Sequence, residues 1–213
     1  MEAIEFKNGT YNGERDKNGF CSGQGKFVWN NNMTYEGNWE NNQINGYGKL
    51  TWKNGNIYEG EFKNGKIDGK GSFIFAKKGI IYKGSFLNGI IQGKGTIIDE
   101  KKQQIIYEGG FLNGRPNGKG KYFFENGDVY EGEFANGKRT GIGKLTVFDD
   151  GVYEGSFLDG ILHGEGKYTS EGGDIYEGTF ANGQLYGKGK ITYADGKTKE
   201  GIFVDGRLIN GEK

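Results

Sequence analysis

A group of residues that could do acid–base chemistry stands at Tyr58-Glu59-Gly60-Glu61-Phe62, and near-copies of it recur along the chain. A carboxylate beside an aromatic ring and a glycine can act as a general acid or base if its pKa is shifted. Here each glutamate is one copy of a repeated residue, and lysines recur on the same face of the expected sheet. A solvated carboxylate near lysines has no reason to hold a shifted pKa, so the motif predicts a structural role.

The other reactive side chains are too few for a catalytic or metal site. His163 is the single histidine and Cys21 the single cysteine, several repeats apart, so they form neither a Cys–His pair nor a metal-ligand spacing. We predict that His163 is an exposed turn residue and Cys21 a small apolar one. Gly-x-Gly elements such as Gly69/Gly71 lack the following helix that a phosphate loop needs. We therefore expect no catalytic residue, no cofactor and no metal.

The period of the motif predicts the architecture. Its copies start 23 to 25 residues apart, and a fixed period in this range indicates stacked supersecondary units. We predict a single array over residues 1–213, with residues 1–10 as an N-terminal cap and a partial repeat at 199–213. The full repeats start at Tyr11, Tyr35, Tyr58, Tyr82, Tyr107, Tyr130, Tyr153 and Tyr176.

Each repeat is predicted to be an antiparallel β-hairpin. In residues 58–63 aromatic and glycine positions alternate with charged ones, Asn64-Gly65 supplies a tight turn, and residues 69–75 alternate again. Aromatic and glycine positions should share one face, with Phe62 opposite the Gly69/Gly71 end and Tyr58 near Phe75. Both glycines of each Gly-x-Gly are expected to receive rings from a neighbouring strand. The fold class is thus all-β, an elongated, twisted single sheet of stacked hairpins.

The opposite face should be charged. Glutamates follow the tyrosine position and lysines follow the second glycine of Gly-x-Gly, so they can pair across strands. Lys83 stands where glutamate is usual, and the flanking strands carry Ser72 and Thr96 where lysine is usual. This exchange avoids a like-charge clash and supports the pairing.

The composition restricts the classes of partner. Lys plus Arg and Asp plus Glu both count 28 with no basic stripe, which disfavours nucleic acid. No apolar run approaches the ~18 residues of a membrane span. A single cysteine and an acidic start, Met1–Glu5, without a basic-then-apolar leader predict a reducing, cytoplasmic location.

Departures from the repeat predict where specificity lies. Trp29, Trp39 and Trp52 make the N-terminal third the richest aromatic surface, for groove contact or for plain packing. The Asp99–Gln104 segment is longer than its counterparts and should protrude at one rim. The partial repeat from Lys199 is expected to lack a second strand, which would leave an open edge for self-association.

Tyr-Glu-Gly-x-Phe-x-Asn-Gly followed by Gly-x-Gly resembles the MORN (membrane occupation and recognition nexus) repeat, over residues 11–213. The resemblance implies an aromatic-lined groove on an elongated sheet, and a scaffold of ciliary, axonemal or other cytoskeletal assemblies that sometimes dimerises through terminal repeats. Arg15 and Lys199 depart from the pattern at the two ends. Together with the tryptophans, the implied groove residues are Trp29, Tyr35, Trp39, Trp52, Tyr58, Phe62, Tyr82, Phe86, Tyr107, Phe111, Tyr130, Phe134, Tyr153, Phe157, Tyr176, Phe180 and, at the end, Phe203.

Three functions follow from these features. The first is a non-enzymatic scaffold that binds a protein partner along the groove. The second is a peripheral membrane adaptor for anionic phospholipid, although the polybasic cluster that such binding uses is missing from the sequence. The third is an enzyme with an unrecognised site, for which no residue can be named.

The predicted architecture can be tested by small-angle X-ray scattering with light scattering. About 17 strands at a spacing of roughly 4.8 Å predict a particle on the order of 80 Å long. An elongated scattering profile is the expected result. A compact, near-spherical particle of the same mass would contradict the repeat array.

Overall fold

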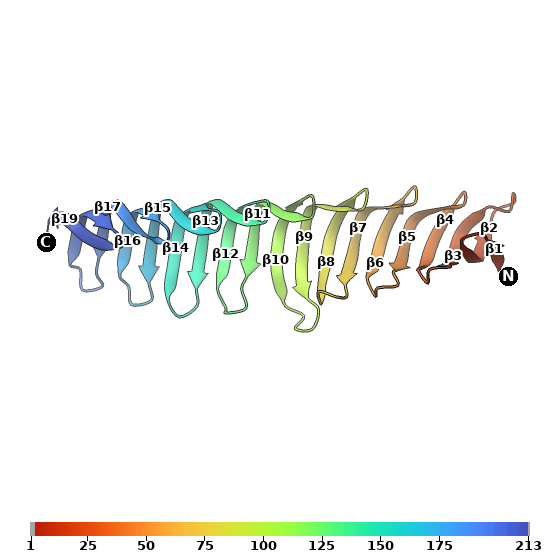
Figure 1. Ribbon diagram of the computed structural model, residues 1–213, viewed down its shortest axis with the longest axis horizontal. Helices are drawn as coiled ribbons and strands as arrows, with labels where there is room; N and C mark the ends of the chain where they lie inside the picture. Colours follow the sequence, from red (N-terminus) through yellow and green to blue (C-terminus); the bar gives the residue numbers. More distant parts are fainter. Residues whose placement is uncertain (1–2, 213) are drawn as a thin grey trace. The chain divides into compact units, whose positions relative to one another are not determined.

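A computed structural model describes residues 3–212, and these residues form nineteen β-strands without a helix. The strands follow one another through short turns (Figure 1). Their bounds are β1 (Ile4–Phe6), β2 (Gly9–Arg15), β3 (Cys21–Trp29), β4 (Thr34–Glu40), β5 (Gln43–Thr51), β6 (Ile57–Lys63), β7 (Lys66–Phe75), β8 (Ile80–Leu87), β9 (Ile90–Asp99), β10 (Ile105–Leu112), β11 (Arg115–Phe123), β12 (Val129–Ala135), β13 (Lys138–Val147), β14 (Gly151–Leu158), β15 (Ile161–Ser170), β16 (Ile175–Ala181), β17 (Gln184–Thr192), β18 (Thr198–Val204) and β19 (Arg207–Glu212).

The chain forms two compact units. The first holds the residues up to Ile106 together with Phe111–Gly114, and the second holds Tyr107–Gly110 and the residues from Arg115 onward. In the first unit β1 to β9 pair antiparallel in chain order. In the second unit β11 to β19 do the same. The prediction of an all-β fold of stacked antiparallel hairpins is confirmed in each unit.

Two strands at the ends bring the number to 19 rather than about 17. At the start, β1 pairs with β2. At the end, β19 pairs with β18, so the prediction that the partial repeat lacks a second strand is wrong. The physical reason is that Asp205-Gly206 forms the same turn as Asn-Gly elsewhere, with φ of 48° and 73°. The edge expected to self-associate is therefore β19, while residues 1, 2 and 213 of the predicted cap and partial repeat lie outside the described residues.

The hairpin turns need residues that tolerate a left-handed backbone. Asn64 has φ of 49° and Gly65 has φ of 75°, the pair of positive values that a two-residue turn of type I′ requires. Asparagine accepts this conformation more readily than most residues with a Cβ, and glycine accepts it without strain. The local sequence thereby fixes where each strand reverses.

In the repeats that start at Tyr11 to Tyr153, the core is a tyrosine ring that lies over two facing glycines. Gly60 pairs with Gly71, and Tyr58 pairs with Phe73 rather than with Phe75 as expected. A Cβ added at Gly71 would stand 2.5 Å from Cε2 of Tyr58, so the ring occupies the space that a side chain would need. The Tyr58 hydroxyl donates a hydrogen bond of 2.9 Å to the carbonyl oxygen of Glu61, and the residue is fully buried. In these repeats the second glycine of Gly-x-Gly is therefore the site that a tyrosine ring covers.

The first glycine of Gly-x-Gly has a different role, which corrects the prediction for that position. Gly69 has φ of 106°, and a Cβ added there would meet the Glu61 side chain on the charged face. The cause is a β-bulge between Gly60 and Phe62, which places Phe62 opposite Ile67 within its own hairpin. In this conformation the first glycine turns away from the rings. Positive φ recurs at Gly23, Gly46, Gly93, Gly118, Gly141, Gly164 and Gly187.

The stacked repeats are connected by edge-to-face ring contacts. The Tyr58 ring meets Phe62 of its own strand with centroids 5.1 Å apart and Phe86 of the next repeat at 5.1 Å, with interplanar angles of 85° and 83°. Edge-to-face pairs contribute about 0.5–1.5 kcal/mol beyond the area that they bury. The second unit repeats the arrangement, because Tyr130 contacts both Phe134 and Phe157. We call this alternating series of tyrosines and phenylalanines the aromatic ladder.

The opposite face carries exposed cross-strand ion pairs, as predicted. Lys144 and Glu154 approach within 3.0 Å, and Lys26 and Glu36 within 3.8 Å. Lys83 pairs with Ser72 on one side and Thr96 on the other, so the expected exchange is confirmed. Exposed pairs of this kind contribute roughly 0–1 kcal/mol each, so the charged face does little to stabilise the sheet.

The contact between ring and glycine predicts a large effect of one methyl group. Gly71→Ala should lower the free energy of unfolding by about 1–3 kcal/mol, because the buried Tyr58 ring cannot move away from the new Cβ. The control is Gly172→Ala, where a Cβ would meet nothing closer than Ser170 Oγ at 3.9 Å. Thermal and urea unfolding midpoints measure both variants. Equal midpoints for the two variants would contradict this account of the core.

Candidate functional site

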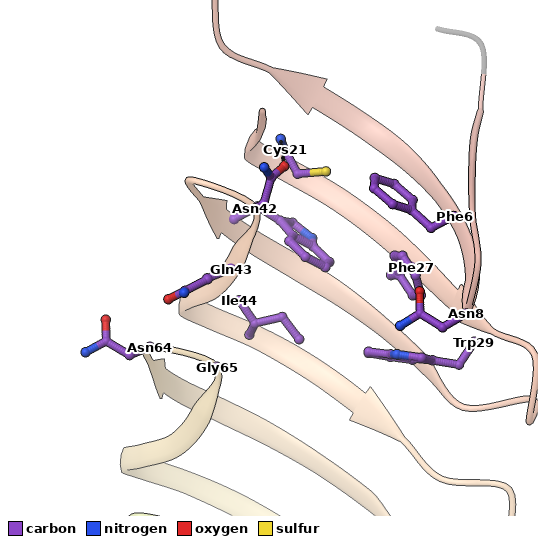
Figure 2. A pocket seen from close by; sticks show the side chains of 11 residues that line it. Phe6, Asn8, Cys21, Phe27, Trp29, Asn42, Gln43, Ile44, Asn64 and Gly65 are labelled. Atoms are coloured by element: carbon purple, nitrogen blue, oxygen red, sulfur yellow. Dashed lines mark hydrogen bonds between the residues drawn. The ribbon is translucent and has the colours of Figure 1, made fainter. Parts of the chain in front are cut away.

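In the first unit a pocket of about 440 Å³ lies on the aromatic face. Phe27 and Trp29 line it from β3, Trp39 lies between them and Ile44 of β5, and the turn residue Gly65 closes one side. Figure 2 shows these side chains around a common space, with Phe6 of β1 at its other side. An apolar hollow of this size accepts one or two side chains of a partner.

The second unit has a similar pocket of about 400 Å³ on its aromatic face. Leu145 of β13 occupies the repeat position of Phe27, Leu185 of β17 occupies that of Ile44, and Gly206 occupies that of Gly65. Tyr168 and Tyr176 add two rings. Because the same repeat positions line both pockets, each unit carries a section of an aromatic groove.

The structure places most of the predicted groove residues below this surface. The ladder tyrosines, Tyr35 among them, are 0–1% exposed, and the ladder phenylalanines are 1–5% exposed. Trp39 is 8% exposed and donates its indole N–H to the carbonyl oxygen of Gly25 at 3.1 Å. Their role in partner binding stays a prediction, and these rings form the base on which accessible side chains rest. The buried ladder residues are Tyr35, Tyr58, Tyr82, Tyr107, Tyr130, Tyr153, Phe62, Phe86, Phe111, Phe134, Phe157, Phe180 and Phe203.

Trp29 and Trp52 are half-buried, so part of each ring is accessible, and Trp29 lines the pocket of the first unit. Trp29 packs on Phe27 with ring centroids 4.8 Å apart, and Trp52 packs on Phe73 at 5.3 Å. Each indole is thus supported by a phenylalanine while it remains accessible. Tryptophan in such a setting is favoured at binding hot spots.

Tyr176 departs from the other tyrosines, because it is half-buried and stands outside the ladder. Its ring packs on Tyr168 with centroids 5.7 Å apart. The place that it would take over Gly189 is filled by Leu185 and Phe203, which would lie 3.2 and 3.3 Å from an added Cβ. As a result Tyr176 presents its ring to the pocket of the second unit.

The hairpin repeats and their two pockets agree with the match to a known family. The MORN repeat family matches residues 17–34, 35–57, 58–80, 82–101, 107–129, 130–149, 153–175 and 176–198. The chain belongs to the MORN repeat family. MORN repeats are commonly scaffold or interaction modules, and the family is generally non-enzymatic.

Solved structures add no argument about this MORN array. BamB from Moraxella catarrhalis aligns at 11% identity over 86% of this chain and 71% of its own, with a TM-score of 0.18. Virginiamycin B lyase from Staphylococcus aureus aligns at 11% identity over 91% and 88%, with a TM-score of 0.19. Such low TM-scores do not indicate a shared fold. A comparison with curated proteins finds no match.

Sequence reasoning missed Arg139 of β13, the one cation at a MORN position that is otherwise apolar. Its guanidinium carbon lies 5.2 Å from the ring centre of Phe124, 5.6 Å from that of Tyr130 and 5.8 Å from that of Phe157. Its Nη2 donates a hydrogen bond of 2.6 Å to the carbonyl oxygen of Gly160, and burial lowers the pKa of the guanidinium. An alignment of the repeats would have singled out Arg139, because every equivalent residue is uncharged. These equivalent residues are Cys21, Ile44, Ile67, Ile91, Pro116, Leu162, Leu185 and Leu208.

Cys21 is buried as the sequence predicts, and the prediction for His163 is right in its exposure but wrong in its element. His163 is exposed, although it belongs to strand β15 rather than to a turn. Cys21 is 3% exposed, and burial raises the pKa of its thiol. Across residues 3–212 no group of three or more His, Cys, Asp or Glu side chains is arranged to hold a metal ion. The same residues contain no helix long and apolar enough to cross a membrane.

The buried tyrosines predict that the MORN array unfolds in alkali. Burial raises the pKa of Tyr35 and of Tyr107 from 10.0 to about 12 in the folded chain. A raised pKa in the folded state means that stability is unaffected below about pH 10 and is lost as the pH rises toward 12. Circular dichroism and tyrosinate absorbance, followed together through this range, should change together. Ionisation of these tyrosines near pH 10 with the strands intact would contradict the prediction.

Proposed function

We propose that this protein is a non-enzymatic scaffold that binds a segment of a protein partner along its aromatic groove. The observation that supports the proposal most directly is the pocket beside Trp29, where an accessible indole and a buried Trp39 line an apolar hollow of about 440 Å³. Interface hot spots are enriched in tryptophan and tyrosine that sit in well-packed pockets. The pocket of the second unit, with Tyr168 and Tyr176, offers the same chemistry.

The groove suits a protein segment better than the other classes of ligand. Its accessible surface is mainly aromatic and aliphatic, while the lysines and glutamates lie on the other face in equal-and-opposite pairs. Nucleic acid and anionic lipid are both held by excess positive charge, which the chain, with 28 basic and 28 acidic residues, does not supply. An apolar groove with polar turns at its rim favours peptide side chains as anchors.

The proposal extends to the assembly in which the scaffold acts. We place it in a ciliary, axonemal or other cytoskeletal assembly in the cytoplasm, on the resemblance of its repeats to scaffolds of such structures. The edge strand β19 offers a second contact, because an unpaired strand edge can pair with another chain. Identification of the captured partner decides both points.

The groove is tested by affinity capture from native cell extract with wild-type protein and with the double variant Trp29→Ala/Trp52→Ala. We expect the double variant to capture at least tenfold less of the partner than the wild-type protein does, because truncation of a hot-spot aromatic residue costs about 2 kcal/mol or more of binding free energy. Tyr47→Ala is the control, since Tyr47 is a 56% exposed aromatic residue on the charged face. Circular dichroism confirms that each variant is folded.

Full capture by the folded double variant would show that the groove of the first unit does not bind the partner. Flotation with phosphoinositide-containing vesicles is run beside the capture. Strong, salt-sensitive flotation of the wild-type protein would favour the membrane adaptor in place of the scaffold.

A further inference from the structure

We infer that Arg139 selects partner segments in which an acidic side chain lies next to an apolar anchor. The inference rests on the proposed function, since it names the chemistry of the segment that enters the groove of the second unit. It concerns two neighbouring places on the aromatic face of that unit. One is the guanidinium of Arg139, and the other is the pocket lined by Leu162, Leu185, Tyr168 and Tyr176.

The charge of Arg139 is only partly balanced within its own unit, where the carboxylate of Asp128 acts on it without forming an ion pair. Among the described residues no carboxylate lies within ion-pair distance of the guanidinium, which donates its hydrogen bond to the carbonyl oxygen of Gly160. The neighbouring Lys138, by contrast, pairs with Asp159 at 3.0 Å. Arg139 instead lies among three aromatic rings, so its half-buried charge is stabilised by ring faces, by one neutral oxygen and by the carboxylate of Asp128 beyond ion-pair distance.

The rings and the hydrogen bond around Arg139 hold its guanidinium in an orientation that favours the binding of a carboxylate. The rings and the bond to Gly160 restrict its orientation, so little side-chain entropy remains to be lost on binding. A guanidinium has five N–H donors in a planar fork that matches the two oxygens of a carboxylate. Partial removal of water strengthens a charge-assisted hydrogen bond. A lysine or an amide side chain of the partner could not form these paired, charge-assisted hydrogen bonds with the guanidinium.

The spacing of the two contacts follows from the sheet. Leu162 takes on β15 the repeat position that Arg139 takes on β13, and β14 lies between these two strands. Two strand spacings amount to about 10 Å. The acidic and apolar side chains of the partner should therefore lie about 10 Å apart along the groove. Asp150 and Asp205 also line the pocket, so like charge keeps the acidic side chain at the Arg139 end.

The test uses the full chain and a random-peptide display library selected in parallel on wild-type protein and on Arg139→Leu. Peptides enriched on the wild-type protein should carry Asp or Glu, and peptides enriched on the variant should not. For the synthetic wild-type peptides, Arg139→Leu should raise the Kd at least tenfold. Replacement of the peptide's acidic residue by Ala should have the same effect on wild-type binding and none on the variant.

The controls separate recognition from folding. Leucine is the native residue at the equivalent positions 162 and 185, so Arg139→Leu should fold with an unchanged or higher thermal midpoint. Arg115→Leu, which removes an exposed arginine of the preceding repeat in the same unit, should leave the Kd unchanged. Arg139→Glu should restore binding to peptides in which the acidic residue is replaced by Lys.

The outcomes distinguish the two proposals. Peptides whose binding is lost in Tyr168→Ala/Tyr176→Ala but retained in Arg139→Leu would overturn the selection of acidic segments and leave the groove function in place. A selection that enriches no peptide on the wild-type protein would overturn both. Acidic peptides with a Kd that depends on Arg139 establish the inference.

Discussion

The structure depends on a tyrosine ring that lies flat over two facing glycines. In the repeat of Tyr58, the glycine pair Gly60 and Gly71 leaves a hollow that the ring fills, and the hydroxyl of the ring satisfies a backbone carbonyl. This contact lets a single sheet bury a large side chain completely without a second layer above it. The edge-to-face contacts with Phe62 and Phe86 then connect each ring to the next repeat. Stability is thereby local to each repeat and its neighbours, as in other repeat arrays.

Because of this contact between ring and glycine, the residues that stabilise the fold differ from the residues that are accessible to a partner. Because the ladder rings are buried, recognition is left to side chains that rest on them, such as Trp29, Trp52 and Tyr168. Tyr176 becomes accessible because Leu185 and Phe203 fill its usual place. A uniform repeat would give a uniform groove. We therefore propose that the specificity of this MORN array arises at positions where the pattern is broken.

Arg139 is the clearest of these departures. A cation at an otherwise apolar position introduces positive charge on the aromatic face, and aromatic rings compensate part of the cost of its burial. The position is occupied by leucine or isoleucine in most repeats, so a stable array does not need the arginine. Its presence is better explained by recognition than by stability. The charged face, by comparison, repeats one pairing rule and offers little to distinguish one site from another.

The sequence by itself determined the all-β hairpins, the positions of the turns and the two faces, because a period of two and Asn-Gly turns act over a few residues. It also located the tyrosines, the glycines and the exchange of charge at Lys83. Only the tertiary structure decided the β-bulge that turns Gly69 away from the rings, the burial of the ladder beneath the groove and the release of Tyr176. It also placed Arg139 among three rings. These features depend on how neighbouring repeats fill space, and packing between residues 20 or more positions apart is not written in any single repeat.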